Sequence, residues 1–236
     1  MNTSSGRVAL ITGAAGTLGR AVATTLGRQG LRLALLARRE DDLHGFATAK
    51  EAGQRLCLAA DLLDTAQVEY AVAQTLQRLG RIDILCNIAG GFHMGDKVHE
   101  TSDEAWDFMF NINVRTLTNM ASAVVPHMLE AGSGKIVNIG AFAARHGEAG
   151  KGAYIASKSA VIRLTESMAL ELRAQGINVN CVLPTIIDTP ANRAAMPDAD
   201  PARWVAPEAL ADVIAFLASD AARAVHGAAL PVTGLS

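Results

Sequence analysis

The stretch VALITGAAGTLG, residues 8–19, predicts more of the fold than any other part of the chain. Its first four residues, Val8 to Ile11, form the short continuous apolar run of a buried strand. A turn with three glycines follows at once, and apolar spacing of three to four residues then runs from Leu18 to Arg28. The stretch therefore predicts a strand, a tight turn and a helix in immediate succession.

The same alternation of strand and helix continues to the end of the chain. Strands that are apolar on both faces and separated by helices form a parallel sheet that is covered by helices on both sides. The sequence therefore predicts one α/β domain over residues 1–236, with a doubly wound, Rossmann-like parallel sheet of about seven strands. The further strands are expected at 31–36, 55–59, 82–86, 135–139, 177–183 and 228–232, and the further helices at 66–79, 106–129, 154–173 and 207–218, with Gly80 and Gly176 as left-handed helix ends.

Composition argues against several other classes of protein. Hydrophobic residues make up 50% of the 236 residues, the net charge is -2, and no basic run stands out, so neither a nucleic acid nor an anionic membrane is expected as a partner. The polar start of the chain lacks the apolar core of a signal peptide, which makes the cytoplasm the expected location. Cys57, Cys86 and Cys181 have no metal or redox spacing and are expected as buried free thiols, and no metal site is expected.

Three irregular segments, 90–102, 140–152 and 184–207, each follow a predicted strand. Ligands of open α/β sheets bind at the carboxyl ends of the strands. We therefore expect these segments to line one crevice. The part of the third segment at about 188–206 is rich in alanine and proline, and it is expected to act as a substrate lid.

The glycine turn indicates a dinucleotide-binding site. Gly13, Gly16 and Gly19 allow a tight turn, a close approach to a pyrophosphate and close packing of helix on strand. The helix that begins near Leu18 offers unpaired N–H groups to phosphate. The Thr17 hydroxyl either caps this helix or binds a phosphate oxygen.

The end of the second strand favours NADP(H) over NAD(H). Ala37 supplies no carboxylate for a ribose 2′-hydroxyl, whereas Arg38 and Arg39 supply two guanidinium groups for a 2′-phosphate, with Arg38 as the main contact. After the third strand, Asp61 either accepts a hydrogen bond from the adenine amino group or caps the next helix, and Leu62 is expected beside it. NAD(H) remains the alternative cofactor.

Tyr154 and Lys158 are one helical turn apart and are expected on one helix face. The ordinary pKa of a phenol, about 10, is too high for an efficient base near neutrality. A neighbouring ammonium group is expected to lower it, and the same phenol can protonate an alkoxide during reduction. The lysine can also hold the hydroxyls of the nicotinamide ribose.

With these motifs the chain resembles the short-chain dehydrogenase/reductase family over essentially its whole length. Residues 86–90, 111–114 and 184–189 resemble further family segments. The resemblance implies an NAD(P)-dependent oxidoreductase with a small-molecule substrate and no metal at the reacting centre, which assembles as a homotetramer or homodimer. It assigns catalysis to Tyr154, Lys158 and Asn113, the last holding a water in a proton relay, and cofactor contacts to Asn87, Ala89, Gly90, Pro184, Ile187 (through its backbone) and Thr189.

The sequence departs from the family at its catalytic serine. That residue normally lies thirteen positions before the tyrosine, where this chain has Ala141. Either the substrate does not need the hydroxyl, or another group supplies it, or catalysis is slow. His146 and His93 are the alternative donors, unless they are ordinary surface histidines. Smaller departures are Thr17 in place of a glycine and Thr185 in the family's Pro-Gly segment.

Three functions are consistent with these residues. The leading hypothesis is an NADP(H)-dependent carbonyl reductase or alcohol dehydrogenase. Ala141 also allows reduction of a conjugated imine, as in dihydropteridine reductases, although Arg38 differs from the acidic residue that those NADH-preferring enzymes carry. The third is a cofactor-binding protein with little catalysis. Turnover of ketones, diketones and a quinonoid pterin separates the three.

Overall fold

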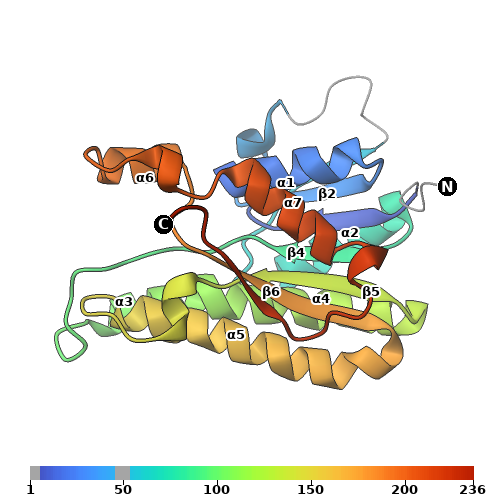
Figure 1. Ribbon diagram of the computed structural model, residues 1–236. Helices are drawn as coiled ribbons and strands as arrows, with labels where there is room; N and C mark the ends of the chain where they lie inside the picture. Colours follow the sequence, from blue (N-terminus) through green and yellow to red (C-terminus); the bar gives the residue numbers. More distant parts are fainter. Residues whose placement is uncertain (1–5, 46–53) are drawn as a thin grey trace.

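The computed structural model describes residues 6–45 and 54–236. The polar segment 1–5, on which part of the expected location rests, lies outside the described residues. Within them the chain folds around one seven-stranded sheet of order β3-β2-β1-β4-β5-β6-β7, in which every pairing is parallel (Figure 1). This confirms the predicted doubly wound fold. The strands are β1 (Val8–Ile11), β2 (Arg32–Ala37), β3 (Arg55–Ala59), β4 (Ile84–Asn87), β5 (Gly134–Ile139), β6 (Ile177–Pro184) and β7 (Ala229–Val232).

Helices cover both faces of the sheet (Figure 1). Neighbouring residues of a strand point to opposite faces, and β1 shows the result. Ala9 and Ile11 join the apolar core beneath α1 and α7, whereas Val8 and Leu10 join the core beneath α2 and α4. The helices are α1 (Thr17–Arg28), α2 (Thr65–Leu79), α3 (Asp103–Phe110), α4 (Thr116–Ala131), α5 (Gly152–Leu172), α6 (Pro190–Ala195) and α7 (Pro207–Leu217).

The helix predicted over 106–129 is present and is longer at both ends, running without a break from Asp103 to Ala131. The structure has α3 and α4 there, joined by a π-helical turn at Asn111–Arg115. Such turns occur often at functional sites. Here the turn contains Asn113, whose side chain is buried and bonded to a distant loop. A tertiary contact therefore accompanies a π-helical turn within this continuous helix, and apolar spacing alone does not reveal that turn.

Helix ends agree with the sequence at two glycines and differ at one cap. Gly80 and Gly176 both adopt the predicted left-handed conformation, with φ of 79°. The residue that caps α2 is Asp64, whose side chain accepts hydrogen bonds from the backbone N–H groups of Ala66 and Gln67. Asp61 is therefore not the cap, and that alternative is wrong.

Segment 188–206 contains structure that the sequence analysis missed. Pro190 begins α6, and the Thr189 side chain caps it by accepting from the Asn192 N–H. The two ends of the segment meet at a parallel bridge between Ile187 and Val205. The segment is therefore closed at its base by backbone pairing.

Cys86 and Cys181 are buried free thiols, as expected, and Cys57 is a half-buried one. In the described part of the chain, no helix has both the length and the apolar character needed to cross a bilayer.

Candidate active site

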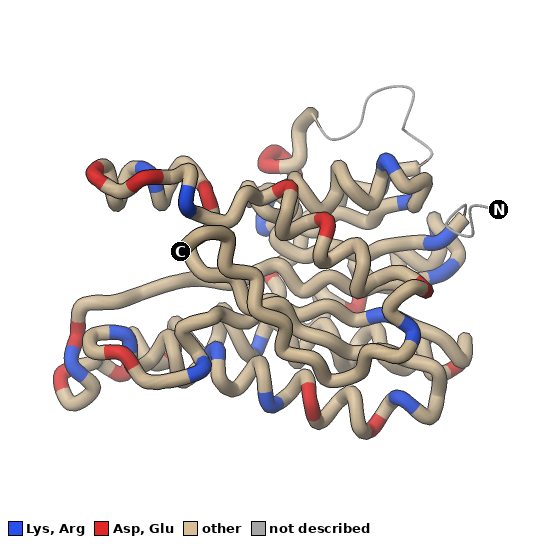
Figure 2. The backbone as a smooth tube through the Cα atoms, in the orientation of Figure 1, with Lys and Arg blue, Asp and Glu red and all other residues tan. Residues whose placement is uncertain are grey.

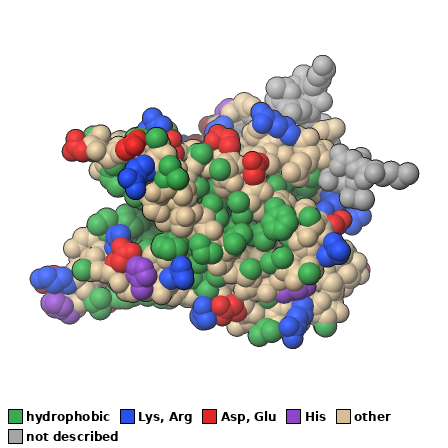
Figure 3. Space-filling view, in the orientation of Figure 1, with side chains coloured by type: hydrophobic (Ala, Val, Ile, Leu, Met, Phe, Trp, Pro, Cys, Tyr) green, Lys and Arg blue, Asp and Glu red, His purple; other side chains and the backbone are tan. Residues whose placement is uncertain are grey.

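Two of the three predicted loops meet above the carboxyl ends of the strands. The Gly95 N–H donates to the Gly150 carbonyl at 2.8 Å. The Phe92 ring contacts the ring of Tyr154, which projects from the start of α5. In the space-filling view a notch opens between the segment that carries α6 and the loops beside α3, with apolar side chains along it (Figure 3).

The glycine turn after β1 has the geometry that a phosphate site requires. Gly13 has a φ of +61°, and a Cβ there would lie 2.9 Å from backbone atoms of Ala89. A Cβ on Gly19 would lie 2.3 Å from the Gly13 carbonyl oxygen. Only glycine fits at either position, so the turn packs directly against the end of β4.

The N-terminus of α1 is open to an anion. Gly16 is its N-cap, no side chain caps the helix, and no acidic residue lies in its first turn. Thr17 is the first helical residue, so the prediction that its hydroxyl caps the helix is wrong. The unpaired N–H groups and the positive end of the helix dipole fit a pyrophosphate.

Thr12 holds the turn and the end of β4 together, a role that sequence reasoning missed. Its buried hydroxyl oxygen accepts hydrogen bonds from the Ile88 and Ala89 N–H groups at 3.0 and 3.1 Å. The available signal was a polar residue at the end of a wholly apolar strand, next to Gly13. Ala89 is thus positioned by Thr12 as well as by Gly13.

The two arginines after β2 have different surroundings. The Arg39 guanidinium donates to Asp42 at 2.6 Å, and this hydrogen bond raises the pKa of Arg39 and lowers the pKa of Asp42. Arg38 is exposed, and its side chain makes no hydrogen bond or ion pair with residues 6–45 or 54–236. Asp42 is thus hydrogen-bonded by Arg39, and the charge of Arg38 also contributes to the lowered pKa of Asp42.

Asp61 and Leu62 form an ordered turn after β3. Asp61 accepts from the Leu63 N–H at 2.9 Å, and the Asn119 side chain donates to the Leu62 carbonyl at 2.9 Å. Leu62 is buried in the core beneath α2 and α4. The bond from Asn119 connects this turn to the helix that follows the π-helical turn.

Asn87 is the outermost member of a buried polar chain. Its Nδ2 donates to Asn138 Oδ1 at 2.9 Å, and Asn138 Nδ2 donates to the Thr165 hydroxyl at 2.9 Å. The Asn87 Oδ1 atom is buried and has no hydrogen-bond partner among the described residues. The chain ties β4 to β5 and α5, and sequence reasoning missed Asn138 and Thr165.

Asn113 brings the π-helical turn to the loop after β4. Its Nδ2 donates to the Gly91 carbonyl and to the Ser157 hydroxyl, both at 3.1 Å, and its Oδ1 accepts from the Gly91 N–H at 3.0 Å. Ser157 lies on α5 between Tyr154 and Lys158. The buried carboxamide therefore sets the distance between that loop and the helix that carries both predicted catalytic residues.

Lys158 is buried and points back to the end of β5, where its ammonium donates to the Ile139 carbonyl at 2.8 Å. Burial lowers the pKa of Lys158 to about 8. Gly90 lies between the two predicted polar residues, because a Cβ there would be 3.0 Å from Asn113 Oδ1 and 3.2 Å from Lys158 Nζ. The structure therefore brings Gly90, Asn113 and Lys158 together.

The pKa of Tyr154 shifts in the direction opposite to the one predicted. Burial raises the pKa of Tyr154 to about 12, and the nearby Glu148 carboxylate adds to the rise. The predicted lowering by Lys158 is therefore wrong for the protein alone. The physical reason is that water is removed from around the phenol, which disfavours phenolate.

Ala141 presents a buried methyl group where a hydroxyl was sought. It belongs to an apolar cluster with Leu117 and Leu183, and Tyr154 packs against this cluster. Neither alternative donor is buried beside it. His93 is exposed, with Nε2 2.9 Å from Asp96 Oδ2, and His146 is exposed in the loop before α5.

The loop after β6 is organised by Asn192, another residue that was missed. Its side chain donates to the Ile187 carbonyl at 2.8 Å, and its backbone N–H donates to the Thr189 hydroxyl at 3.1 Å. Pro184 ends β6, and Thr185 next to it bonds to the Thr233 carbonyl at 2.9 Å. The Ile187 carbonyl is thus already engaged within the protein.

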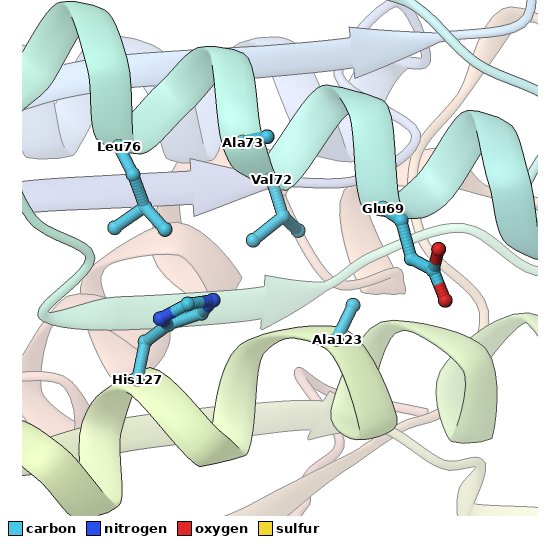
Figure 4. A pocket seen from close by; sticks show the side chains of 6 residues that line it. All are labelled: Glu69, Val72, Ala73, Leu76, Ala123 and His127. Atoms are coloured by element: carbon cyan, nitrogen blue, oxygen red, sulfur yellow. The ribbon is translucent and has the colours of Figure 1, made fainter.

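Two hollows elsewhere on the surface contain none of the predicted site residues. One lies between α2 and α4, where Val72, Leu76 and Ala123 face the His127 ring (Figure 4). The other lies at the far end of α5, beside Arg173 and His226. Basic and acidic residues are interspersed along the backbone in Figure 2.

Comparison with known proteins agrees with this geometry. The family model for short chain dehydrogenase matches residues 7–200. The chain is 35% identical to 2-(R)-hydroxypropyl-CoM dehydrogenase of Xanthobacter autotrophicus, over 97% of each chain, and 42% identical to sorbitol dehydrogenase of Cereibacter sphaeroides, over 78% of this chain and 71% of that one. A crystal structure of carveol dehydrogenase from Mycobacterium avium in complex with NAD superposes with a TM-score of 0.89, at 30% identity, over 98% of this chain and 97% of that one.

A parallel sheet with a glycine turn after β1, and a helix that carries a partly buried tyrosine one turn from a buried lysine, is typical of a dinucleotide-dependent oxidoreductase. The chain belongs to the short-chain dehydrogenase family. It is an NAD(P)-dependent oxidoreductase that acts on alcohols or carbonyl compounds.

Proposed function

We propose that this protein is an NADP(H)-dependent carbonyl reductase, or alcohol dehydrogenase, in which Tyr154 exchanges the proton. The observation that carries the proposal is the partly buried Tyr154 one helical turn from the buried Lys158, on a helix that Asn113 connects to the loop after β4. When bound, the nicotinamide supplies or accepts the hydride. The substrate supplies the carbonyl or hydroxyl group.

The raised pKa of Tyr154 favours the reductive direction. With a pKa of about 12, the phenol carries its proton at neutral pH and can donate it to the oxygen of a carbonyl that is being reduced. Lys158, with a pKa of about 8, is mainly an ammonium at neutral pH, and it lies one helical turn from Tyr154. Asn113 positions both residues through Ser157 and is proposed to hold the relay water.

Arg38 supports the choice of NADP(H). Both arginines follow the end of β2. Arg39 forms an ion pair with Asp42, whereas Arg38 forms no ion pair with any described residue. A 2′-phosphate would give it a bidentate partner. We expect Arg38→Ala to weaken NADPH binding by about tenfold or more and to leave NADH binding nearly unchanged, as measured by cofactor fluorescence. Equal losses for both cofactors would contradict this role.

Ala141 restricts the substrate. Without a hydroxyl at this position, Tyr154 is the proposed donor to the substrate oxygen, so an activated carbonyl is favoured over a simple ketone. A conjugated imine is the second candidate, because protonation of its nitrogen also needs only one donor. His146→Ala should leave turnover unchanged, since the ring is exposed.

The test is absorbance of NADPH or NADH with simple ketones, diketones and a quinonoid pterin. We expect diketones to be reduced with NADPH. Tyr154→Phe should abolish turnover and retain NADPH binding. Turnover of the pterin alone would support the second candidate. Cofactor binding without turnover of any of these substrates would support the third function, a cofactor-binding protein with little catalysis.

A further inference from the structure

Phe92 is an exposed aromatic residue in a defined position against Tyr154. The two rings meet edge to face, with centroids 4.8 Å apart and planes at 84°. Aromatic pairs favour this arrangement because the ring edge is positive and the ring face is negative. Nevertheless 54% of Phe92 is exposed. Much of the Phe92 ring is therefore exposed, although it keeps a defined contact with the Tyr154 ring.

The backbone before Phe92 is held rigidly. Both polar backbone groups of Gly91 bond to the Asn113 carboxamide, at 3.0 and 3.1 Å. A Cβ at position 91 would lie 3.1 Å from Ile112, so the loop also lies closely against the π-helical turn. Phe92 therefore extends from a backbone position that Asn113 determines.

The backbone after Phe92 is held as well. The Gly95 N–H donates to the Gly150 carbonyl, and Val98 packs on Gly152, where a Cβ would be 2.7 Å from it. Both glycines lie within four residues of Tyr154. Figure 1 shows this long loop beside α3 and the start of α5. Since both ends of the loop are anchored to the elements around Tyr154, Phe92 does not depend on core packing for its place.

Apart from the nearby Glu148 carboxylate, the surroundings of the Tyr154 ring are largely apolar. It packs against the cluster that includes Ala141, Leu117 and Leu183. Phe92 covers another part of the ring. A substrate whose carbonyl oxygen reaches the phenol must place its adjacent group near these apolar side chains. A flat apolar ring fits beside the open part of Phe92 better than a charged or strongly polar group.

We propose that Phe92 is a positioning residue for Tyr154 and selects carbonyl substrates that carry an aryl group next to the reacting carbon. This inference rests on the proposed function. It adds the substrate class and assigns a role to a residue outside the catalytic set. The edge-to-face contact orients the phenol, and the uncovered part of the ring contacts the aryl group.

The experiment compares 1-phenyl-1,2-propanedione with 2,3-butanedione, which share the reacting dione and differ in the aryl group. We expect wild-type kcat/KM to favour the aryl dione. Phe92→Leu should reduce that preference about tenfold, mainly through a higher KM for the aryl dione. Phe92→Trp should largely keep the preference. Phe216→Leu, which alters an exposed phenylalanine on α7, is the matched control and should behave as wild type.

A pH profile tests the positioning role. Removing the Phe92 ring admits water to the phenol, so the apparent pKa of Tyr154 in Phe92→Leu should fall toward its ordinary value. The alcohol-oxidation profile should then move to lower pH, which a purely structural role would not cause. An unchanged aryl preference together with a superimposable profile would overturn the proposal.

Failure of the proposed function gives a different result. If neither dione is reduced with NADPH or NADH, the carbonyl-reductase proposal fails. The role of Phe92 is then decided by calorimetric titration of 1-phenyl-1,2-propanedione into the protein with NADP+. Binding about tenfold weaker in Phe92→Leu than in wild type supports it. Equal binding in the two proteins, or no binding by wild type, refutes it.

Discussion

Gly13 and Gly30 provide a matched test of the packing between the glycine turn and β4. Both have positive φ, 61° and 85° respectively. A Cβ on Gly13 would lie 2.9 Å from the Ala89 backbone, whereas a Cβ on Gly30 would meet nothing within 4 Å. Replacing either by alanine therefore introduces the same backbone strain, about 1–2 kcal/mol. Only Gly13→Ala adds steric overlap with backbone atoms.

The overlap sets the size of the expected difference. Overpacking of this kind adds about 1–3 kcal/mol, so Gly13→Ala should lower the free energy of unfolding by about 2–5 kcal/mol in total. At about 2–4 °C per kcal/mol for a chain of this size, the Tm should fall by about 2–8 °C for Gly30→Ala and by about 4–20 °C for Gly13→Ala.

Thermal unfolding at equal protein concentration measures the stability of both variants, and cofactor fluorescence measures their binding of NADPH. Gly13→Ala should also weaken NADPH binding, because the overlap displaces the turn from the end of β4, and Gly30→Ala should not. Equal Tm losses in the two variants, or full NADPH affinity in Gly13→Ala, would refute the reasoning.

Three further predictions concern the residues around the proposed proton donor. Because burial lowers the pKa of Lys158 from 10.5 to about 8, the unfolded chain binds more protons than the folded one between these pH values. The stability of wild type relative to Lys158→Met should therefore rise from pH 8 to 10.5, by up to about 3 kcal/mol, in chemical denaturation; a flat difference would contradict it. Ala141→Ser restores a hydroxyl and should speed reduction of simple ketones by about tenfold or more, with a smaller gain for diketones, in NADPH absorbance assays; equal rates in variant and wild type would show that the hydroxyl is not what limits turnover. Glu148→Gln removes a carboxylate that raises the pKa of Tyr154, so the pH profile of alcohol oxidation should move to lower pH, by less than about one unit because burial is the larger cause. A shift of this profile to higher pH would show that Glu148 does not raise the pKa of Tyr154.

Much of the fold could be read along the chain because strand burial is a local pattern. Both β1 at Val8–Ile11 and β3 at Arg55–Ala59 have the predicted bounds. The apolar run of β1 is buried throughout, whereas β3 is a partly buried edge strand that begins with Arg55, and neither pattern needs knowledge of distant residues. The glycine turn, Arg38 and the helical pair of Tyr154 and Lys158 could be predicted for the same reason, since each belongs to a pattern of only a few neighbouring residues.

The rest depended on contacts between distant segments. The bonds from Asn113 to Gly91, 22 positions away, accompany the π-helical turn within the helix predicted over 106–129. Thr12 clamps the end of β4 across 76 positions. The rise in the pKa of Tyr154 follows from burial, which the spacing of Tyr154 and Lys158 on one helix does not reveal. Local pattern thus determined which elements form and which side chains share a helix face, whereas only the packing of loops from separate strands decided how much water reaches the phenol.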